Sequence, residues 1–417
     1  MVVCAIVKLV VQVRLLPTPE QAAALEATLR TVNRAANEVS RVAFARKIHA
    51  GRDLRRVTYG QVRAAFGLGS QPAQHTIKKV ADAYTALRAN LRNGTYGPAN
   101  SPRRLKAESQ PISFRPLAAQ PFDDRCLSWD HDARTISIWT SSGRAKNVAF
   151  TGSAAQLAQL RKHRRGESDL LSRDGMWFLL ATIEIPEAPL REPDGFLGVD
   201  LGIANIATTC PATTPSTTPI GAATPAAGTE PATGAGPSPA RYSGAKLNAV
   251  RHRHRELRRR LQAKATKSAK RLLKKRRRKE ARFAADTNHV IAKRIVTEAQ
   301  RTGHGIALED LQGIRDRVRL RKPQRVTLHS WSFHQLGGFI TYKARRAGVA
   351  VIHVDPAYTS RQCSACGHTD RRNRPSQSTF SCTSCGFAEH ADVNAARNIA
   401  TRGVADWAVS HAADDAA

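Results

Sequence analysis

Residues 196–202 read Phe-Leu-Gly-Val-Asp-Leu-Gly, a short apolar run that carries one acid, Asp200. Short apolar runs that are bounded by glycine are typical of buried strands. A second run of this kind, Gly-Ile-Ala-Leu-Glu at 305–309, ends in Glu309. Further on, residues 390–399 predict the start of a helix, with Asp392 near its first turn. The sequence therefore predicts two strands and one helix start that each present a carboxylate.

The order of these acids, on a first strand, after a later strand and on the last helix, is that of an RNase H-like nuclease site. Two Mg²⁺ ions about 4 Å apart polarise the attacking water and stabilise the leaving oxygen of a phosphodiester, and such hard cations require oxygen ligands. Each acid alone is weak evidence, because an Asp at a helix start is more often a cap. Their joint order predicts that Asp200, Glu309 and Asp392 hold Mg²⁺, with two ions expected.

Four of the seven cysteines form two Cys-x-x-Cys pairs near the C-terminus, separated by fifteen residues. This spacing is typical of one tetrahedral zinc ion, and the glycine after each pair lets the backbone turn around the metal. Because thiolates fill all four positions, the zinc is expected to be structural and not to activate water. The predicted ligands are Cys363, Cys366, Cys382 and Cys385. The other three, Cys4, Cys126 and Cys210, are interpreted as isolated reduced thiols.

The charge of the chain predicts a polyanionic partner. Lys and Arg total 66 against 33 Asp and Glu, which gives a formal net charge of +33 and a sequence pI of about 11.0. Nucleic acid and an anionic membrane surface are the two candidates. The sequence has no apolar run of about 18 residues and no signal-peptide pattern at its start. We therefore expect nucleic acid as the partner, no membrane association, and a cytoplasmic or nucleoid location.

The basic charge is densest in one segment. Residues 241–282 contain nineteen Lys and Arg against two Glu, yet Val250, Leu257 and Leu261 keep a helical stripe within it. So many cations on roughly 60 Å of helix repel one another unless phosphates neutralise them. The residues expected to bind nucleic acid are Lys274, Lys275, Arg276, Arg277, Arg278 and Lys279. The preceding stretch, 211–240, is rich in Pro, Thr, Ala and Gly without any Lys or Arg, and is predicted to be a disordered loop.

The N-terminal half predicts a β-domain with helices inserted in it. A strand over 8–15 is followed by a helix from Pro19 to about Ile48, with Thr18 as its cap, and by a second helix over 74–91. Short alternating runs between 113 and 187 predict a β-barrel or sandwich that includes the first strand. The runs expected to be strands are 112–114, 135–139 and 177–185.

Four segments together resemble a known family. Residues 198–202, 308–311, 359–367 and 390–396 look like the split RuvC motifs and zinc ribbon of TnpB proteins, RNA-guided nucleases of insertion sequences from which the compact type V CRISPR effectors descend. The resemblance covers roughly 190–402 with specific motifs, while the N-terminal half agrees only in the order of its elements.

The resemblance implies an α+β multidomain chain. An N-terminal wedge-like β-barrel, 1–18 and 105–190, would contain an inserted helical recognition module, 19–104. An RNase H-like RuvC domain would follow and contain an inserted zinc ribbon. Its expected bounds are 191–358 and 390–417, with the ribbon at 359–389 and basic helices at 246–300.

The resemblance also implies a function. Asp200, Glu309 and Asp392 would be the catalytic acids of an RNA-guided DNA endonuclease, and the segment Lys246 to Arg282 would hold guide RNA or its heteroduplex with target DNA. The main alternative is a nuclease-inactive relative that binds DNA under RNA guidance and represses transcription. A zinc-ribbon transcription or ribosomal protein would not explain the three acids, and no Tyr or Ser recombinase signature supports a transposase in the strict sense.

Overall fold

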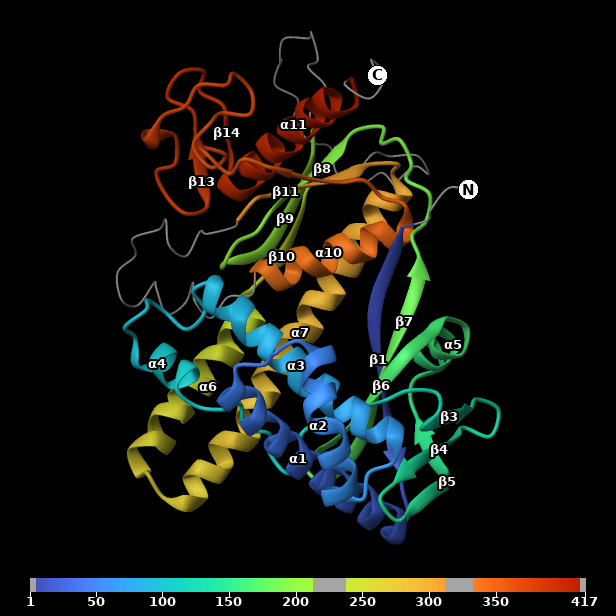
Figure 1. Ribbon diagram of the computed structural model, residues 1–417. Coiled ribbons are helices and arrows are strands. Elements are labelled where there is room, and N and C mark those ends of the chain that lie inside the picture. The colour runs from blue at the N-terminus through green and yellow to red at the C-terminus, as the bar shows by residue number, and fades with distance from the viewer. Residues whose placement is uncertain (1–4, 213–237, 312–332, 413–417) are drawn as a thin grey trace. The chain divides into compact units, whose positions relative to one another are not determined.

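The computed structural model describes residues 5–212, 238–311 and 333–412 (Figure 1). The chain divides into two compact units, Lys8–Ile185 and the combination of Met1–Val7 with Pro186–Ala417. Most of the predicted loop at 211–240 lies outside the described residues. Within the described part, none of the helices combines the length and the apolar character that crossing a membrane requires.

The helices of the first unit begin with α1, Pro19–Arg46. Thr18 caps this helix as predicted: its hydroxyl accepts from the Gln21 backbone, and the Gln21 side chain returns to the Thr18 backbone. The helix predicted over 74–91 is α3, Ser70–Arg92. Helix α2, Gly51–Phe66, was not predicted, because its buried stripe is short and includes a threonine. Two shorter helices, α4 (Pro102–Glu108) and α5 (Ala154–His163), were not predicted either.

An antiparallel sheet completes this unit. Its seven strands run in the order β2-β6-β7-β1-β5-β4-β3, and its described ladders are antiparallel. The order ends at β2 on one side and β3 on the other, so the predicted barrel is not a complete one. The bounds are β1 Ile6–Leu16, β2 Gln120–Phe122, β3 Leu127–Asp130, β4 Thr135–Thr140, β5 Gly143–Thr151, β6 Arg164–Arg173 and β7 Met176–Pro186.

One predicted strand of this unit is wrong. Residues 112–114 form no strand, because the backbone there bonds to side chains of the helices instead of to a neighbouring strand. The Phe114 amide donates to Asn37 Oδ1 at 2.7 Å, and the Ile112 amide lies 3.4 Å from the Tyr84 hydroxyl. The strands predicted at 135–139 and 177–185 are confirmed as β4 and β7.

The second unit is built on a five-stranded mixed sheet in the order β10-β9-β8-β11-β12. The two acid-bearing strands, β8 and β11, are parallel neighbours in its centre, and β12 is parallel to β11. β9 and β10 continue the sheet antiparallel on the other side. The bounds are β8 Phe196–Asp200, β9 Asn205–Pro211, β10 Ala240–Ser243, β11 Gly305–Glu309 and β12 Val351–Val354.

Helices pack on both faces of this sheet. Leu197, Val199, Ile306 and Leu308 share one core with helices α7 (Lys267–Arg301) and α10 (Phe333–Ala347). The alternate residues Phe196 and Ala307 share another core with Ile399 of helix α11 (Ala391–Ala412). Because successive side chains of a strand point to opposite faces, every second residue of β8 and β11 faces α11.

Two further features complete the unit. Helices α6 (Ala245–Lys264) and α7 follow β10 and pack against each other, so the basic segment is a helical hairpin. Between β12 and α11 the chain forms a small module with a 3₁₀ turn, Arg371–Asn373, and a two-stranded sheet. The strands of that sheet are β13 Thr379–Ser381 and β14 Ala388–His390.

Candidate functional site

The first two acids lie side by side at the ends of adjacent strands. Val199 of β8 pairs with Leu308 of β11, so Asp200 and Glu309 are the next residues along the two parallel strands. Val199 and Leu308 both point into the core with α7 and α10. Asp200 and Glu309 therefore belong to the face that α11 covers.

The third acid comes from that helix. Asp392 lies in the first turn of α11, and a close backbone approach fixes the helix on the sheet. A Cβ atom built on Gly198 would lie only 1.9 Å from the carbonyl oxygen of Ala396, so glycine at 198 is required for the helix to pack here. Because Ala396 is one turn after Asp392 and Gly198 is two residues before Asp200, this contact brings the two carboxylates together.

The charges of Glu309 and Asp392 both act on Asp200. Burial raises the pKa of Asp200 well above its usual value, and the charges of Glu309 and Asp392 raise it further. Burial also raises the pKa of Glu309, although the hydrogen bond from Thr359 opposes that shift. Because neighbouring negative charges disfavour the ionised form of Asp200, a cation beside this carboxylate would be favoured.

A β-bulge places an unpredicted residue beside Asp392. The ladder between β9 and β10 pairs Tyr242 with Ala207 and then Ser243 with Asn205, so one residue of β9 is left over. Such bulges redirect side chains next to active sites. Here Asn205 donates from Nδ2 to Asp392 Oδ2 at 2.9 Å. No sequence pattern marks a bulge of this kind, and the sequence analysis missed this residue.

Two other residues contact the acids and were not predicted to do so. The Thr359 hydroxyl donates to Glu309 Oε1 at 2.6 Å, and Thr359 is only 3% exposed. The Arg374 guanidinium lies 3.2 Å from Asp392 Oδ1, and its charge lowers the pKa of Asp200, against the effect of burial. Arg374 lies between the two cysteine pairs in the sequence, where no motif distinguishes it from its basic neighbours.

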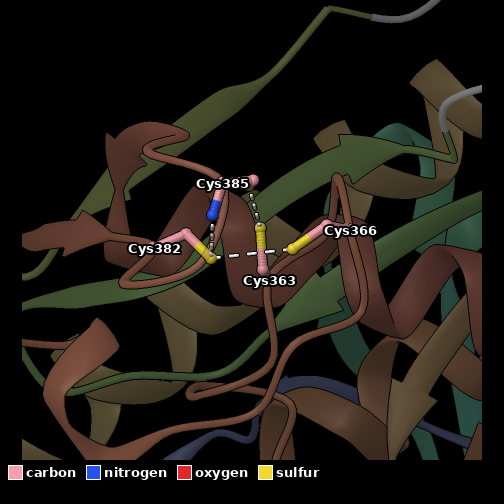
Figure 2. Close-up of side chains that lie close together, drawn as sticks. All are labelled: Cys363, Cys366, Cys382 and Cys385. Atoms are coloured by element: carbon pink, nitrogen blue, oxygen red, sulfur yellow. Dashed lines mark hydrogen bonds between the residues drawn. The ribbon is translucent and has the colours of Figure 1, made fainter.

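The four predicted zinc ligands meet in one cluster (Figure 2). Their sulfur atoms all lie within 4.8 Å of one another, with 3.8 Å between Cys363 and Cys385 and 3.6 Å between Cys366 and Cys382. Among the described residues this is the one group of three or more His, Cys, Asp or Glu side chains brought together so tightly.

The backbone turns sharply after each cysteine pair. Gly367 and Gly386, which follow the two pairs, have φ values of 77° and 73°, a region that favours glycine, as the sequence predicted. Backbone amides of Cys385 and Ser384 point at the Cys382 sulfur and lower the pKa of this thiol to about 6, whereas burial raises the pKa of Cys363 to about 12. The amides therefore favour the thiolate, which is the form that binds zinc, at Cys382.

The basic hairpin presents its charge to solvent. The side chains of Lys274, Lys275, Arg276 and Lys279 are exposed on α7, while those of Arg277 and Arg278 lie outside the described residues. Glu256 and Glu280 are the two acids of the segment 241–282, and both are engaged with arginines: Glu280 pairs with Arg258 across the hairpin at 2.9 Å, and Glu256 pairs within α6. The hairpin therefore carries a large excess of cations over the acids that could neutralise them.

Comparison with known proteins shows homology in the C-terminal part. Residues 333–399 match the family model described as Cas12f1-like, TNB domain. The chain is 46% identical over 123 residues to the CRISPR-associated endodeoxyribonuclease Cas12f1 of Sulfoacidibacillus thermotolerans, covering 29% of this chain and 28% of that protein. It is 38% identical over 86 residues to the putative RNA-guided DNA endonuclease InsQ of Escherichia coli strain K12, covering 21% of each.

The chain thus spans less than a third of the length of these two curated relatives. It also has TnpB-like proteins among its homologues. A cryo-EM structure of a Cas12f1-sgRNA-target DNA complex matches the fold over 95% of this chain and 99% of that one, with a TM-score of 0.54 and 13% sequence identity. This likeness is one of fold, and it includes the N-terminal part of the chain that the family model does not match.

Proposed function

We propose that this chain, a homologue of the Cas12f effectors and TnpB proteins, is an RNA-guided DNA endonuclease. The observation that carries the proposal is the convergence of Asp200, Glu309 and Asp392 from two parallel strands and one helix start. The Cas12f1 and InsQ relatives are named as DNA endonucleases, and we extend that activity to this chain.

The site fits divalent cations of the Mg²⁺ type. Its donors are carboxylate oxygens, the ligands such cations prefer. Burial and mutual repulsion raise the pKa of Asp200, so a bound cation would relieve an unfavourable arrangement. Two Mg²⁺ ions at Asp200, Glu309 and Asp392 would supply an activated water and stabilisation of the leaving oxygen.

The residues around the acids would hold the carboxylates and the phosphate of the substrate in position. Thr359 and Asn205 hold Glu309 and Asp392 by hydrogen bonds, which fixes their carboxylates before cations bind. Arg374 is one-quarter exposed beside Asp392, and its planar guanidinium matches the geometry of a phosphate. We assign Arg374 to binding the phosphate that is cut, with Asp392 as its partner when nucleic acid is absent.

The four cysteines would hold one structural zinc ion. All four tetrahedral positions are thiolates of this chain, so no position remains for water or substrate. Elemental analysis of the purified protein should find about one zinc per chain. An active preparation without zinc would remove the ion from the proposal.

The basic hairpin would hold the nucleic acids. Guide RNA, or its heteroduplex with target DNA, would lie on the cations of α6 and α7, and base pairing would read the sequence.

The domain bounds follow the family resemblance. We propose residues 191–358 and 390–417 as the RuvC-like domain and 359–389 as its zinc ribbon. Residues 1–18 with 105–190 would form the wedge-like domain, and 19–104 the recognition module.

The experiment that tests this function starts from the RNA. The chain is expressed together with the DNA that flanks its gene, and the RNA that copurifies is sequenced. A supercoiled plasmid that matches that RNA should be cut in Mg²⁺ and remain intact in EDTA, while a plasmid without the matching sequence should remain intact in both. Copurified RNA and guided binding without cutting would instead support the nuclease-inactive repressor.

A further inference from the structure

The contacts that orient two of the three acids come from the same short module as the cysteine ligands. Thr359, which bonds to Glu309, lies four residues before Cys363. Arg374, which pairs with Asp392, lies between the two cysteine pairs. The folding of this module around its four thiols therefore affects how the carboxylates of Glu309 and Asp392 are held.

The first connection runs through Thr359. Its hydroxyl lies 2.6 Å from Glu309 Oε1 and 3.2 Å from the Pro356 carbonyl, so the carboxylate is its closer acceptor. The Thr359 carbonyl in turn accepts from Asn398 Nδ2 at 2.8 Å, and the same amide group donates to the Gln362 carbonyl at 2.7 Å. Residues 359–362 are thereby fixed on helix α11.

The start of the first cysteine loop is fixed by the same helix. Asn394, one turn before Asn398, donates to the Gln362 carbonyl at 2.8 Å and accepts from the Ser364 amide at 3.0 Å. The two bonds are made by the residues just before and just after Cys363. Both asparagines are buried, with 0% exposure for Asn394 and 6% for Asn398. Closing the loop on a metal and holding Thr359 in place are thus parts of one network.

The second connection runs through Asn373, which is completely buried. Its Nδ2 donates to the carbonyls of Arg361 and His368 at 3.0 and 3.1 Å, on either side of the first cysteine pair. Its Oδ1 accepts from the amide and the hydroxyl of Thr383, both at 2.9 Å, and Thr383 lies between Cys382 and Cys385. Asn373 therefore joins the two cysteine loops, and the next residue is Arg374.

We propose that Thr359 and Asn373 are positioning residues that couple metal occupancy of the four-cysteine site to cation binding by the three acids. When the loops are closed around a metal, Asn373 joins them and Thr359 holds the Glu309 carboxylate. When the loops open, the contact from Thr359 loosens and Glu309 loses its preorganisation. The Arg374 guanidinium has no part in this effect, because it competes with a cation for Asp392. The inference rests on the proposed function, because it concerns the cation site of the three acids.

The test measures the affinity of the full chain for Mn²⁺ without nucleic acid, by calorimetry. A variant with Asp200, Glu309 and Asp392 all changed to Ala defines the binding that belongs to other sites. Thr359→Val removes the hydroxyl at nearly constant volume, and Thr359→Ser keeps it. Thr369→Val is a matched control, because Thr369 is an exposed residue of the same module.

Residues that orient metal ligands typically contribute 10–100-fold to metal affinity. Thr359→Val and Asn373→Ala should therefore weaken Mn²⁺ binding by about that factor, while Thr359→Ser and Thr369→Val bind as the wild type does. A chain with Cys366 and Cys385 changed to Ser, shown by elemental analysis to hold no zinc, should lose affinity to a similar extent. Wild-type Mn²⁺ affinity in Thr359→Val or in the zinc-free chain would overturn the proposal.

The two proposals fail in different ways. A wild-type chain whose Mn²⁺ affinity depends on Thr359 but which cuts no guided target contradicts the proposed function and supports the coupling. A chain that cuts guided DNA while its Mn²⁺ affinity is unaffected by Thr359→Val and by zinc removal contradicts the coupling alone.

Discussion

The backbone of Gly198 on strand β8 lies directly against that of Ala396 on helix α11. A Cβ atom built on Gly198 would lie 1.9 Å from the Ala396 carbonyl oxygen and 2.5 Å from the Ala400 amide nitrogen. Both obstacles are backbone atoms of one helix, so neither can move without the helix. The glycine between the apolar residues of β8 is therefore a packing requirement of the site and not a turn signal.

Gly198→Ala should accordingly displace α11, with a cost of about 1–3 kcal/mol or more, as expected for overpacking of a close interface. Because α11 carries Asp392, Mg²⁺-dependent cleavage should fall together with stability. The measurement is thermal unfolding in parallel with cleavage rate. Gly337→Ala is the control, since a Cβ there meets nothing within 4 Å, and alanine favours the surrounding helix α10. Equal effects of the two substitutions would contradict the packing argument.

Neutralising part of the basic hairpin should reduce the salt dependence of RNA binding. Lys274, Lys275 and Arg276 are exposed on α7, and each phosphate contact that is lost removes slightly less than one unit from the slope of log affinity against log salt. Changing the three together to Ala should therefore flatten the slope measured by filter binding from about 50 to 300 mM salt. The control changes Lys162, Arg165 and Arg173, basic residues of the first unit that lie in and beside β6. If the α7 variant has the same slope of log affinity against log salt as the wild type, the RNA does not bind at these three residues.

The partly buried Lys79 should make the stability of the first unit depend on pH. Burial lowers its pKa from 10.5 to about 8, although its ammonium donates to Asn33 Oδ1 at 2.6 Å and the charge of Asp169 opposes the shift. Between pH 8 and pH 10.5 the unfolded chain keeps the proton that the folded chain has released, so stability rises with pH in this window.

The matching variant is Lys79→Met, which removes the titrating group. Its stability relative to the wild type should fall by up to about 3 kcal/mol as pH rises from 8 to 10.5, because each unit of pKa shift corresponds to about 1.4 kcal/mol. Melting temperatures of the two proteins across this range give the difference. Parallel curves would show that Lys79 titrates normally in the folded chain.

Much of the site was predictable because its chemistry is local in the sequence. The cysteine spacing predicted the four-thiol cluster, and the apolar runs that end in Asp200 and Glu309 predicted two strands. The contacts around the acids were not predictable in the same way. Asn205 reaches Asp392 through a bulge that depends on the pairing of β9 with β10, and Arg374 reaches it through the folding of the cysteine module.

The fold was also less predictable where the apolar signal was weak. Helix α2 buries only Leu54, Thr58 and Val62 among many arginines, so its period is difficult to recognise from sequence. Residues 112–114 alternate like a strand, yet Asn37 takes the hydrogen bond of the Phe114 amide that a neighbouring strand would otherwise receive. At residues 112–114 a tertiary contact, and not the local pattern, determined the structure.

The strongest test of the site is to remove each acid in turn. Asp200→Ala, Glu309→Ala and Asp392→Ala should each reduce Mg²⁺-dependent cleavage by a factor on the order of 10³ or more, because the two-cation arrangement loses a ligand and several kcal/mol of transition-state stabilisation. Guided binding to DNA should be retained, since the phosphate contacts come from the basic surface and the loss of an acid reduces repulsion.

A purely structural role of the same residues predicts a different outcome, most clearly at Asp392. An Asp that only stabilises a helix start contributes about 1 kcal/mol, and Asn serves nearly as well in that role. Asp392→Asn should therefore cut normally if the residue is structural, and should be as inactive as Asp392→Ala if its charge holds a cation. Asp406→Ala, an exposed acid on the same helix, controls for the loss of charge. Binding affinity and cleavage rate must be measured on the same protein, RNA and target. Near wild-type cutting by any one of the three Ala variants would exclude that residue from the set of cation ligands.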